Sequence, residues 1–267
     1  MAKTLVTHIN PHLDDILGIW LFRKYHPGFK DANLEFISAS RENNESADKI
    51  YIGTGGGKFD EHKEGLATCA GSLVFEYLNR EGFIPQDQVI QKALGRLVEW
   101  NKLIDTGQAP DSEFDEFSVQ SLIRVRDNSP DSSKRAVELG EELLSRILQV
   151  LKRKQQAITD WEKRVEFESK FGKSYAVVSE TINREFCREQ DGDLFLMYDP
   201  RYKSVQFFAP VKDIAEVFSK VKSLDPQASW FLHQSHHMVI CGSSSAPESK
   251  PTRLTPEQLI EIAKGVS

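Results

Sequence analysis

The stretch that decides the fold is KTLVTHINPHLDDILGIWLF, residues 3–22. Its start, residues 3–7, is typical of a buried strand, and apolar side chains spaced three or four apart in residues 14–25 predict a helix. Between the strand and the first residues of the helix the chain has four side chains of types that bind metal ions: His8, His12, Asp14 and Asp15. One strand-to-helix turn therefore carries both the start of the fold and a candidate site.

Strands and helices alternate in the residues that follow. Short strands are expected at 34–40 and 49–53, and helices at 69–82 and 86–105. Such alternation is typical of a mainly parallel sheet with flanking helices. We therefore predict an α/β domain over residues 1–130.

The sequence changes character between residues 132 and 171, where apolar residues recur at helical spacing among many charged ones. These positions are Ala136, Gly140, Leu143, Ile147, Leu151, Ile158, Trp161 and Val165. The pattern predicts a long helix, or a pair of helices, that connects two domains, and we assign this linker to residues 131–171. An amphipathic layer on one domain is the alternative.

The carboxy-terminal part alternates again. Its expected elements are strands at 173–181, 194–199, 204–210, 229–234 and 237–242 and a helix at 212–224. A last helix begins near Thr255, which Pro256 and Gln258 follow in the pattern of a capping box. We predict a smaller α+β domain over residues 172–267.

The overall composition limits the classes of function. The chain has 267 residues and a formal net charge of -6, which argues against a protein that coats long duplex nucleic acid. Its three cysteines are far apart and form no CxxC pair, so reduced thiols are expected. No apolar run approaches the length of a membrane span, so we expect a cytoplasmic protein without membrane contact. The sequence leaves a homo-oligomer open.

Polar side chains after the predicted strands are the candidates for chemistry, because ligands of an open parallel sheet bind beyond the carboxyl ends of its strands. His8 follows the first strand, and His12 and Asp14 lie on the turn into the helix. Taken alone, this turn has a simpler interpretation, in which Asp14 caps the helix and the histidines are surface residues.

A second polar cluster follows another predicted strand. In YIGTGGGKFDEHKEG, residues 51–65, glycines precede Asp60, Glu61 and His62, and the ending of a phosphate-binding P-loop is missing. Asp105 ends a predicted helix, where a solvent-exposed cap is the alternative. Mixed imidazole and carboxylate ligands favour manganese, iron, zinc or cobalt, and two such ions about 4 Å apart suit phosphoester hydrolysis.

These motifs resemble those of a known superfamily. THINPHLDD is similar to the first motif of the DHH phosphoesterases, whose family II inorganic pyrophosphatases carry His-x-Asn-Pro-Asp-x-Asp, and FDEHKEG resembles their Asp-His-His motif. The greater likeness is to the melanocyte-proliferating-gene family of DHH-like exonucleases. Its Gly-Gly, Glu-x5-Asp-x-Gly and Phe-x-His-x-Ser elements resemble Gly55-Gly56, then Glu99 with Asp105 and Gly107, and FLHQSHH at 231–237.

The resemblance implies an activity and a set of site residues. The expected protein is a metal-dependent phosphoesterase, a hydrolase of nuclease type that cleaves a phosphodiester or nucleotide-like substrate at a cleft between domains. The substrate would be a phosphate-containing small molecule or a short oligonucleotide of RNA or DNA. The expected cofactor is one or two Mn²⁺ ions, with Mg²⁺, Co²⁺ and Zn²⁺ as alternatives.

The roles implied by the resemblance fall on three groups of residues. The implied metal ligands are His8, His12, Asp14, Glu61 and Asp105. Asp60 would orient the metal ligands, and His62 would act at the scissile phosphate as an acid or charge stabiliser. The implied phosphate-binding residues are His233, Lys250 and Arg253; a mobile surface loop is the alternative for the last two.

Two departures from the family pattern bear on activity. Family members have an aspartate before the glycines that bridges two metal ions, and Gly53 stands in its place. Glu61 replaces a histidine ligand and His12 replaces an aspartate, so ligand number is kept while metal preference changes. The competing hypothesis is a degenerate, noncatalytic member that binds a nucleotide or a protein partner.

Overall fold

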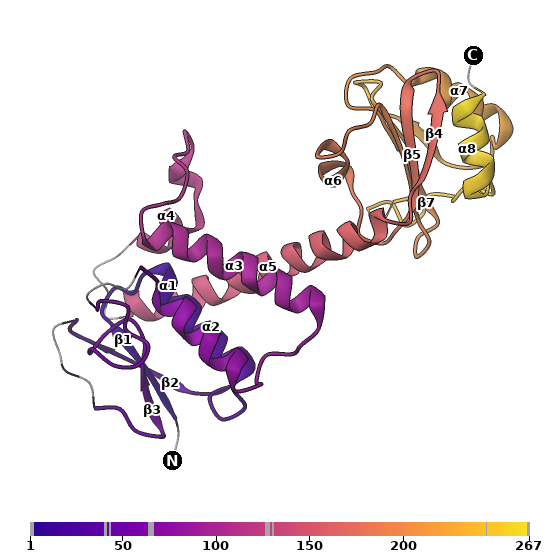
Figure 1. Ribbon diagram of the computed structural model, residues 1–267. Coiled ribbons are helices and arrows are strands. Elements are labelled where there is room, and N and C mark those ends of the chain that lie inside the picture. The colour runs from indigo at the N-terminus through magenta and orange to yellow at the C-terminus, as the bar shows by residue number, and fades with distance from the viewer. Residues whose placement is uncertain are drawn as a thin grey trace. The chain divides into compact units, whose positions relative to one another are not determined.

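The computed structural model describes residues 3–39, 42, 44–63, 67–125, 129, 131–243 and 245–265 of the chain. The chain divides into two units, Met1–Lys152 and Arg153–Ser267. One long helix, α5 (Ser132–Trp161), begins in the first unit and ends in the second (Figure 1). Each unit contains a β-sheet with helices packed on it, so the chain is a mixed α/β protein.

The sheet of the first unit is fully parallel. Its strands, in the spatial order β2-β1-β3, are β1 (Thr4–His8), β2 (Asn33–Ile37) and β3 (Lys49–Tyr51). Val6 of the central strand pairs with Glu35 on one side and Tyr51 on the other. The parallel sheet predicted for this part of the chain is confirmed. The strand expected to reach Ser40 ends at Ile37, and Ser40 itself lies outside the described residues.

Helix α1 lies at the centre of the first unit. The helices of this unit are α1 (Leu13–Tyr25), α2 (Ala70–Arg80), α3 (Gln88–Asp105), the 3-10 turn η1 (Asp115–Phe117), α4 (Val119–Arg124) and the start of α5. Every residue of α1 from Leu13 to Phe22 is buried, so its apolar side chains are not confined to one face. A Cβ at Gly71 of α2 would lie 2.6 Å from Leu17 Cδ2, which shows how closely these two helices approach.

Helix α5 also packs on α1 through a glycine. A Cβ at Gly140 would lie 2.6 Å from Cγ2 of Ile16. The buried apolar residues of this part of α5 include Val137, Leu144 and Leu148. Leu143 and Ile147, which belong to the helical pattern of the sequence, are only partly buried. Each has an apolar neighbour one position later, so spacing alone does not choose between the two faces.

Helix α5 ends at Trp161, and the prediction of a helical segment through Val165 to Phe171 is wrong. Residues Val165–Ser169 form strand β4. Phe167 is buried there while Glu166 and Glu168 are exposed, an alternation with the period of a strand. The spacing between Trp161 and Val165 fits a helix, but it equally fits the turn that leads into this strand.

The second unit is built on a mixed sheet in the order β4-β5-β6-β7-β9-β8. Among the described strands of this sheet, only β5 and β6 pair in parallel, and the other neighbours pair antiparallel. The further elements are β5 (Gly172–Val178), α6 (Arg184–Arg188), β6 (Leu194–Asp199), β7 (Ser204–Phe208), α7 (Ala215–Leu224), β8 (Trp230–Leu232), β9 (Met238–Cys241) and α8 (Pro256–Lys264). The capping box predicted for the last helix is confirmed, because Thr255 and Gln258 exchange backbone and side-chain hydrogen bonds.

Both faces of this second sheet are covered. Leu194 and Leu196 of β6 pack in one apolar cluster with residues of α7 and α8. Phe195 and Met197, which point to the opposite face, pack with residues of α6 and the end of α5. The end of α5 is therefore part of the core of the second unit.

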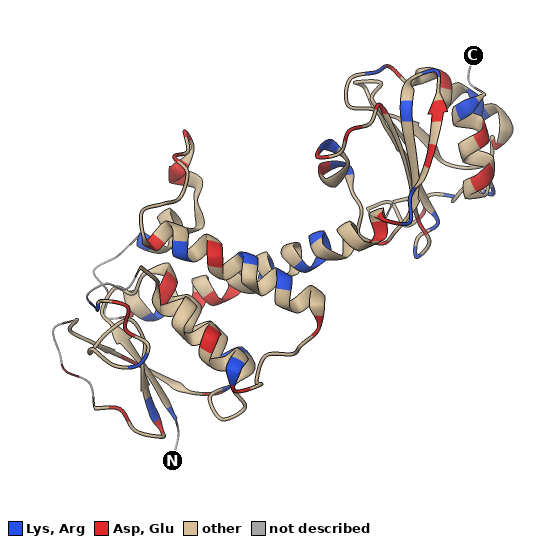
Figure 2. Ribbon diagram, viewed as in Figure 1, with Lys and Arg blue, Asp and Glu red and all other residues tan. Residues whose placement is uncertain are grey.

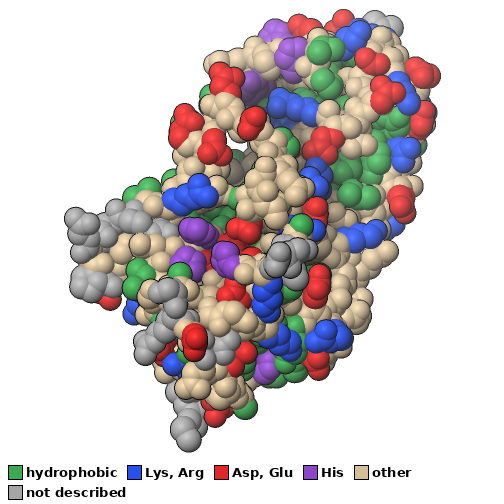
Figure 3. All heavy atoms as spheres, turned by 60° about the vertical axis from the view of Figure 1, so that its left-hand side comes forward, with side chains coloured by type: hydrophobic (Ala, Val, Ile, Leu, Met, Phe, Trp, Pro, Cys, Tyr) green, Lys and Arg blue, Asp and Glu red, His purple; other side chains and the backbone are tan. Residues whose placement is uncertain are grey.

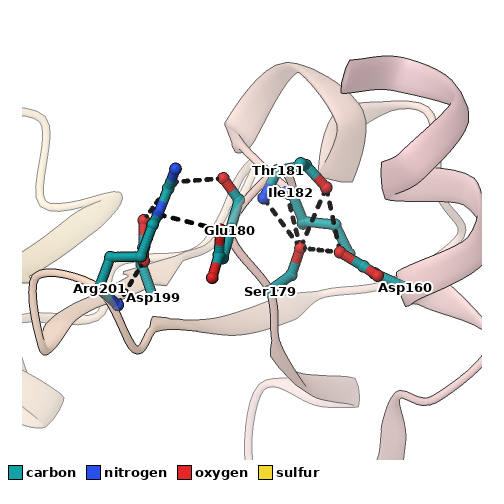
Figure 4. A network of polar contacts seen from close by, with 7 residues as sticks. All are labelled: Asp160, Ser179, Glu180, Thr181, Ile182, Asp199 and Arg201. Carbon is teal, nitrogen blue, oxygen red and sulfur yellow. Dashed lines mark hydrogen bonds and ion pairs between the residues drawn. The ribbon is translucent and has the colours of Figure 1, made fainter. Parts of the chain in front are cut away.

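A polar network ties the end of α5 to the segment after β5 (Figure 4). The carboxylate of Asp160 accepts hydrogen bonds from Ser179 Oγ at 2.6 Å and from Thr181 Oγ1 at 3.1 Å. Ser179 Oγ also accepts from the backbone amide of Ile182 at 3.1 Å. Beside this group, Arg201 donates to the carboxylate of Asp199 and to a backbone carbonyl.

Charged residues of both signs are interspersed along the helices (Figure 2). Within the described part of the chain, no helix combines the length and the hydropathy that crossing a bilayer requires.

Candidate metal centre

The candidate site begins at the turn between β1 and α1. Asn10 has a φ of 59°, and its backbone amide donates to Ser133 Oγ at 2.9 Å. His12 then occupies the N-cap of α1 with extended backbone, and its amide donates to Asp15 Oδ2 at 2.7 Å. The turn is thus held at both ends, and it places His8, His12 and the first aspartates of α1 at the same edge of the sheet.

Asp15 faces the imidazole of His8. The Nε2 of His8 lies 2.9 Å from Asp15 Oδ2, while His8 Nδ1 lies 2.8 Å from the carbonyl oxygen of Ile9. Both ring nitrogens of His8 thus face an acceptor. The hydrogen bond to Asp15 is the largest of the effects that raise the pKa of His8 to about 9. The ligand atoms of His8, His12 and Asp15 lie within 4.8 Å of one another, so these side chains can hold a cation in place of the shared proton.

A second group of three carboxylates adjoins the first. The ligand atoms of Asp14, Glu61 and Asp105 lie within 4.8 Å of one another, although the residues come from α1, the loop after β3 and the end of α3. Burial and the charges of neighbouring carboxylates raise the pKa of Asp14 well above its ordinary value. Burial also raises the pKa of Glu61 to about 7, with a further contribution from Asp15. So much negative charge in one place favours a bound cation.

Asp60 holds His62 beside these carboxylates. The buried Asp60 carboxylate accepts from the amide of Gly56 at 2.6 Å, from the amide of His62 at 3.0 Å and from His62 Nδ1 at 2.9 Å. Burial opposes ionisation of Asp60, but these hydrogen bonds lower its pKa. The imidazole of His62 is 71% exposed, so its other ring nitrogen is accessible from solvent.

A cavity of about 430 Å³ opens over this group. The residues that line it include His12, Asp14, Glu61, His62, Asp105 and Arg124. On the face of the molecule seen in Figure 3, histidine side chains lie beside acidic ones. Arg124 belongs to α4, and the amide oxygen of Gln120, in the orientation that its surroundings favour, accepts from Arg124 at 3.0 Å. The cavity thus brings one guanidinium close to several carboxylates.

Two buried oxygens test whether the site fits a cation. Among the described residues, neither Asp15 Oδ1 nor Glu61 Oε2 has a hydrogen-bond partner, and both atoms are shielded from solvent. A buried charged oxygen without a partner costs roughly 1–3 kcal/mol or more. A divalent cation would satisfy these oxygens, and the imidazoles of His8 and His12 complete a mixed ligand set typical of Mn²⁺, Co²⁺ or Zn²⁺.

The structure brings together the five metal ligands expected from the sequence, His8, His12, Asp14, Glu61 and Asp105, and the pair Asp60 and His62 lies beside them. Asp15, which the sequence placed in the same turn without a ligand role, forms a group with His8 and His12, and Arg124 was not expected at the site. The signal for Asp15 was its place three residues after the N-cap His12, where a carboxylate turns back toward the cap. The end of the FDEHKEG motif, Glu64 and Gly65, lies outside the described residues.

The expected phosphate-binding residues belong to the second unit. Lys250 and Arg253 line a pocket of about 500 Å³ together with Lys203 and Tyr198. His233 is not among the residues that line this pocket; its Nδ1 lies 2.8 Å from Ser235 Oγ in the turn between β8 and β9. Of these three residues, only Lys250 and Arg253 are therefore brought together.

Comparisons with known proteins add nothing to this geometry: no family model matches the chain, and no curated protein matches it either.

Proposed function

We propose that this protein is a divalent-metal-dependent phosphohydrolase that cleaves a phosphodiester or nucleotide-like substrate. The observation that carries the proposal is the pair of adjacent three-ligand groups at one edge of the parallel sheet, His8 with His12 and Asp15, and Asp14 with Glu61 and Asp105. When bound there, a divalent ion would supply Lewis acidity toward the oxygens of a phosphoryl group. The resemblance of these motifs to the DHH phosphoesterases supports the same class of reaction.

The chain's own residues support two further roles in this reaction. His62 is held by Asp60 through Nδ1 and exposes the other side of its ring at the cavity. Burial lowers the pKa of His62, but the hydrogen bond to Asp60 and the charge of Glu61 raise it overall, which favours the protonated ring. We assign His62 the role of general acid toward the leaving oxygen.

Arg124 is the residue that we assign to bind the substrate's phosphoryl oxygens. It lines the same cavity as His62, and a guanidinium binds phosphate through parallel N–H groups. In the second unit, Lys250 and Arg253, which line one pocket, are the residues that the sequence resemblance implies for phosphate binding.

Hydrolysis by the purified full chain tests the proposal. The substrates are bis(p-nitrophenyl) phosphate and a short single-stranded oligonucleotide, each with Mn²⁺ and each with a chelator. We expect Mn²⁺-dependent turnover that Asp14→Asn and His62→Ala each reduce by roughly a hundredfold or more. The matched controls are Asp111→Asn, at an exposed residue, and His237→Ala, at a partly buried one; neither residue lines the cavity, so both variants should leave turnover unchanged. Turnover that does not depend on Mn²⁺, or that neither Asp14→Asn nor His62→Ala reduces, would refute the proposal.

Nucleotide binding without turnover is a second candidate function. It is favoured by Gly53, because this position lacks the carboxylate that bridges two ions in the family that the sequence resembles. Equilibrium binding of a nucleoside monophosphate by the wild-type chain, with no hydrolysis of either substrate in any of Mn²⁺, Mg²⁺, Co²⁺ or Zn²⁺, would select this function over the first.

A further inference from the structure

Gly53 lies directly against the carboxylate of Asp15. A Cβ built on Gly53 would lie 1.7 Å from Asp15 Oδ1 and 2.9 Å from Asp15 Cγ. The backbone cannot easily retreat, because the Gly53 amide donates to the carbonyl of Phe59 at 2.9 Å and its φ is 62°. The space that a side chain at position 53 would occupy is thus filled by the carboxylate that α1 contributes.

The two oxygens of Asp15 have different surroundings. Oδ2 accepts from the His12 amide at 2.7 Å and lies 2.9 Å from His8 Nε2. Oδ1 has no hydrogen-bond partner among the described residues, and Asp15 as a whole is 1% exposed. A helix cap explains the contacts of Oδ2, but it gives Oδ1, buried beside Gly53, no partner in the described part of the chain.

The charge of Asp15 also reaches the second group of carboxylates. Burial raises the pKa of Asp14, Glu61 and Asp105, and the charge of Asp15 raises each of them further. Asp15 therefore forms part of the group with His8 and His12 and interacts with every member of the other group.

We propose that Asp15 is a metal ligand that supplies, from helix α1, the carboxylate that position 53 lacks. Gly53 is then a requirement of this arrangement rather than a lost function, since any side chain there would displace Asp15 Oδ1. The inference rests on the metal centre of the proposed function, but it concerns ion binding and not turnover.

The test measures Mn²⁺ affinity and stoichiometry of the full chain by isothermal titration calorimetry. Asp15→Asn keeps the size of the side chain and an oxygen for the His12 amide but removes the charge. We expect its Mn²⁺ affinity to fall by about tenfold or more, comparable to the loss of a residue that supports a metal site. Circular dichroism and the unfolding midpoint establish that the variant is folded.

Two glycine substitutions separate displacement of Asp15 from backbone strain. In Gly53→Ala the new Cβ displaces Asp15 Oδ1, so we expect Mn²⁺ affinity to fall as it does in Asp15→Asn. In Gly82→Ala the backbone has a similar φ of 75° but the Cβ would meet nothing within 4 Å. This control should lose some stability and keep the wild-type affinity for Mn²⁺.

Relocating the carboxylate is the most direct test. In the double variant Asp15→Ala with Gly53→Asp, the aspartate enters the space that Asp15 has left, and we expect about tenfold recovery of affinity relative to Asp15→Ala alone. Wild-type affinity and stoichiometry in Asp15→Asn would overturn the inference while leaving the metal centre intact. Weaker Mn²⁺ binding in Asp15→Asn, in a protein that hydrolyses neither substrate, would support the inference and remove the proposed hydrolysis.

Discussion

The carboxylate of Asp60 accepts hydrogen bonds from both the backbone amide and the Nδ1 of His62, at 3.0 and 2.9 Å. The ring of His62 is otherwise largely exposed, and its Nδ1 lies 3.4 Å from Glu61 Oε1, so Asp60 is the nearer of the two carboxylates that orient it at the cavity. Asp60 is thus a positioning residue whose effect should pass through His62.

A double-mutant cycle tests this role of Asp60. Asp60→Ala should lower kcat by roughly ten- to hundredfold and change KM little, because the imidazole loses its orientation. Asp60→Asn, which keeps an acceptor oxygen, should retain part of kcat. In a His62→Ala background Asp60→Ala should have little further effect on kcat. If the two losses simply multiply, Asp60 acts by another route.

Arg124 should control substrate affinity. Arg124→Ala should raise KM for bis(p-nitrophenyl) phosphate by roughly tenfold, since the cavity loses its guanidinium and keeps its carboxylates. Arg124→Lys keeps the positive charge but loses the planar guanidinium, so its KM should lie between those of the wild type and Arg124→Ala. Arg146→Ala is the matched control, because Arg146 is exposed on α5 and pairs with Glu142. An unchanged KM in Arg124→Ala would exclude this contact.

The contact between Gly140 and Ile16 should make the first unit sensitive to one added methyl group. Gly140→Ala places a Cβ 2.6 Å from Ile16 Cγ2 and should lower the free energy of unfolding by roughly 1–3 kcal/mol. Gly95→Ala in α3 meets nothing within 4 Å and should instead raise it by about 0.5–1 kcal/mol, because alanine favours a helix. Urea unfolding followed by circular dichroism measures both, and equal effects would contradict the packing argument.

The pH dependence of stability should report on Asp160. Burial opposes its ionisation, but hydrogen bonds from Ser179, Gln156 and Thr181 lower its pKa in the folded chain below the ordinary value of 3.8. Its ionised form therefore stabilises the fold above that value, and this contribution disappears as the pH falls through the lower folded pKa. Asp160→Asn should be less stable than the wild type at pH 7, with a difference that shrinks on acidification.

The control for this pH effect is Asp191→Asn, whose wild-type side chain is 99% exposed. Its unfolding midpoint should follow that of the wild type from pH 7 to about pH 3, because exposed ion pairs contribute little to stability. A difference between Asp160→Asn and the wild type that stays constant over the same pH range would contradict the contribution of the Asp160 carboxylate.

The first strand and helix, and hence the positions of His8, His12 and Asp14, could be predicted from the sequence. The pattern of strand, turn and helix is local, and the side chains lie within a few residues of one another. That Glu61 and Asp105 would join them required the resemblance to a known superfamily, because periodicity carries no information on contacts between residues so far apart in the chain.

Other features depend on contacts that no local pattern records. Arg124 lies on a helix of six residues, too short to show periodicity. On α5, Leu144 and Leu148 are buried while Leu143 and Ile147 are only partly buried, and helical spacing fits either pair equally well. The ligand role proposed for Asp15 depends on the missing side chain at Gly53, and the closeness of these two residues cannot be read from the sequence.

Helix α1 is buried along its first ten residues, from Leu13 to Phe22, and two of the carboxylates at the site extend from its first turn. The backbone of Asp14 and Asp15 cannot shift far unless the helix moves within the core, so the positions from which these carboxylates extend are set before any ion arrives. A metal site of the kind proposed would therefore start from two carboxylates on a fixed backbone, and it would bind an ion that requires short, octahedral contacts, such as Mg²⁺, less well than larger or less demanding ions.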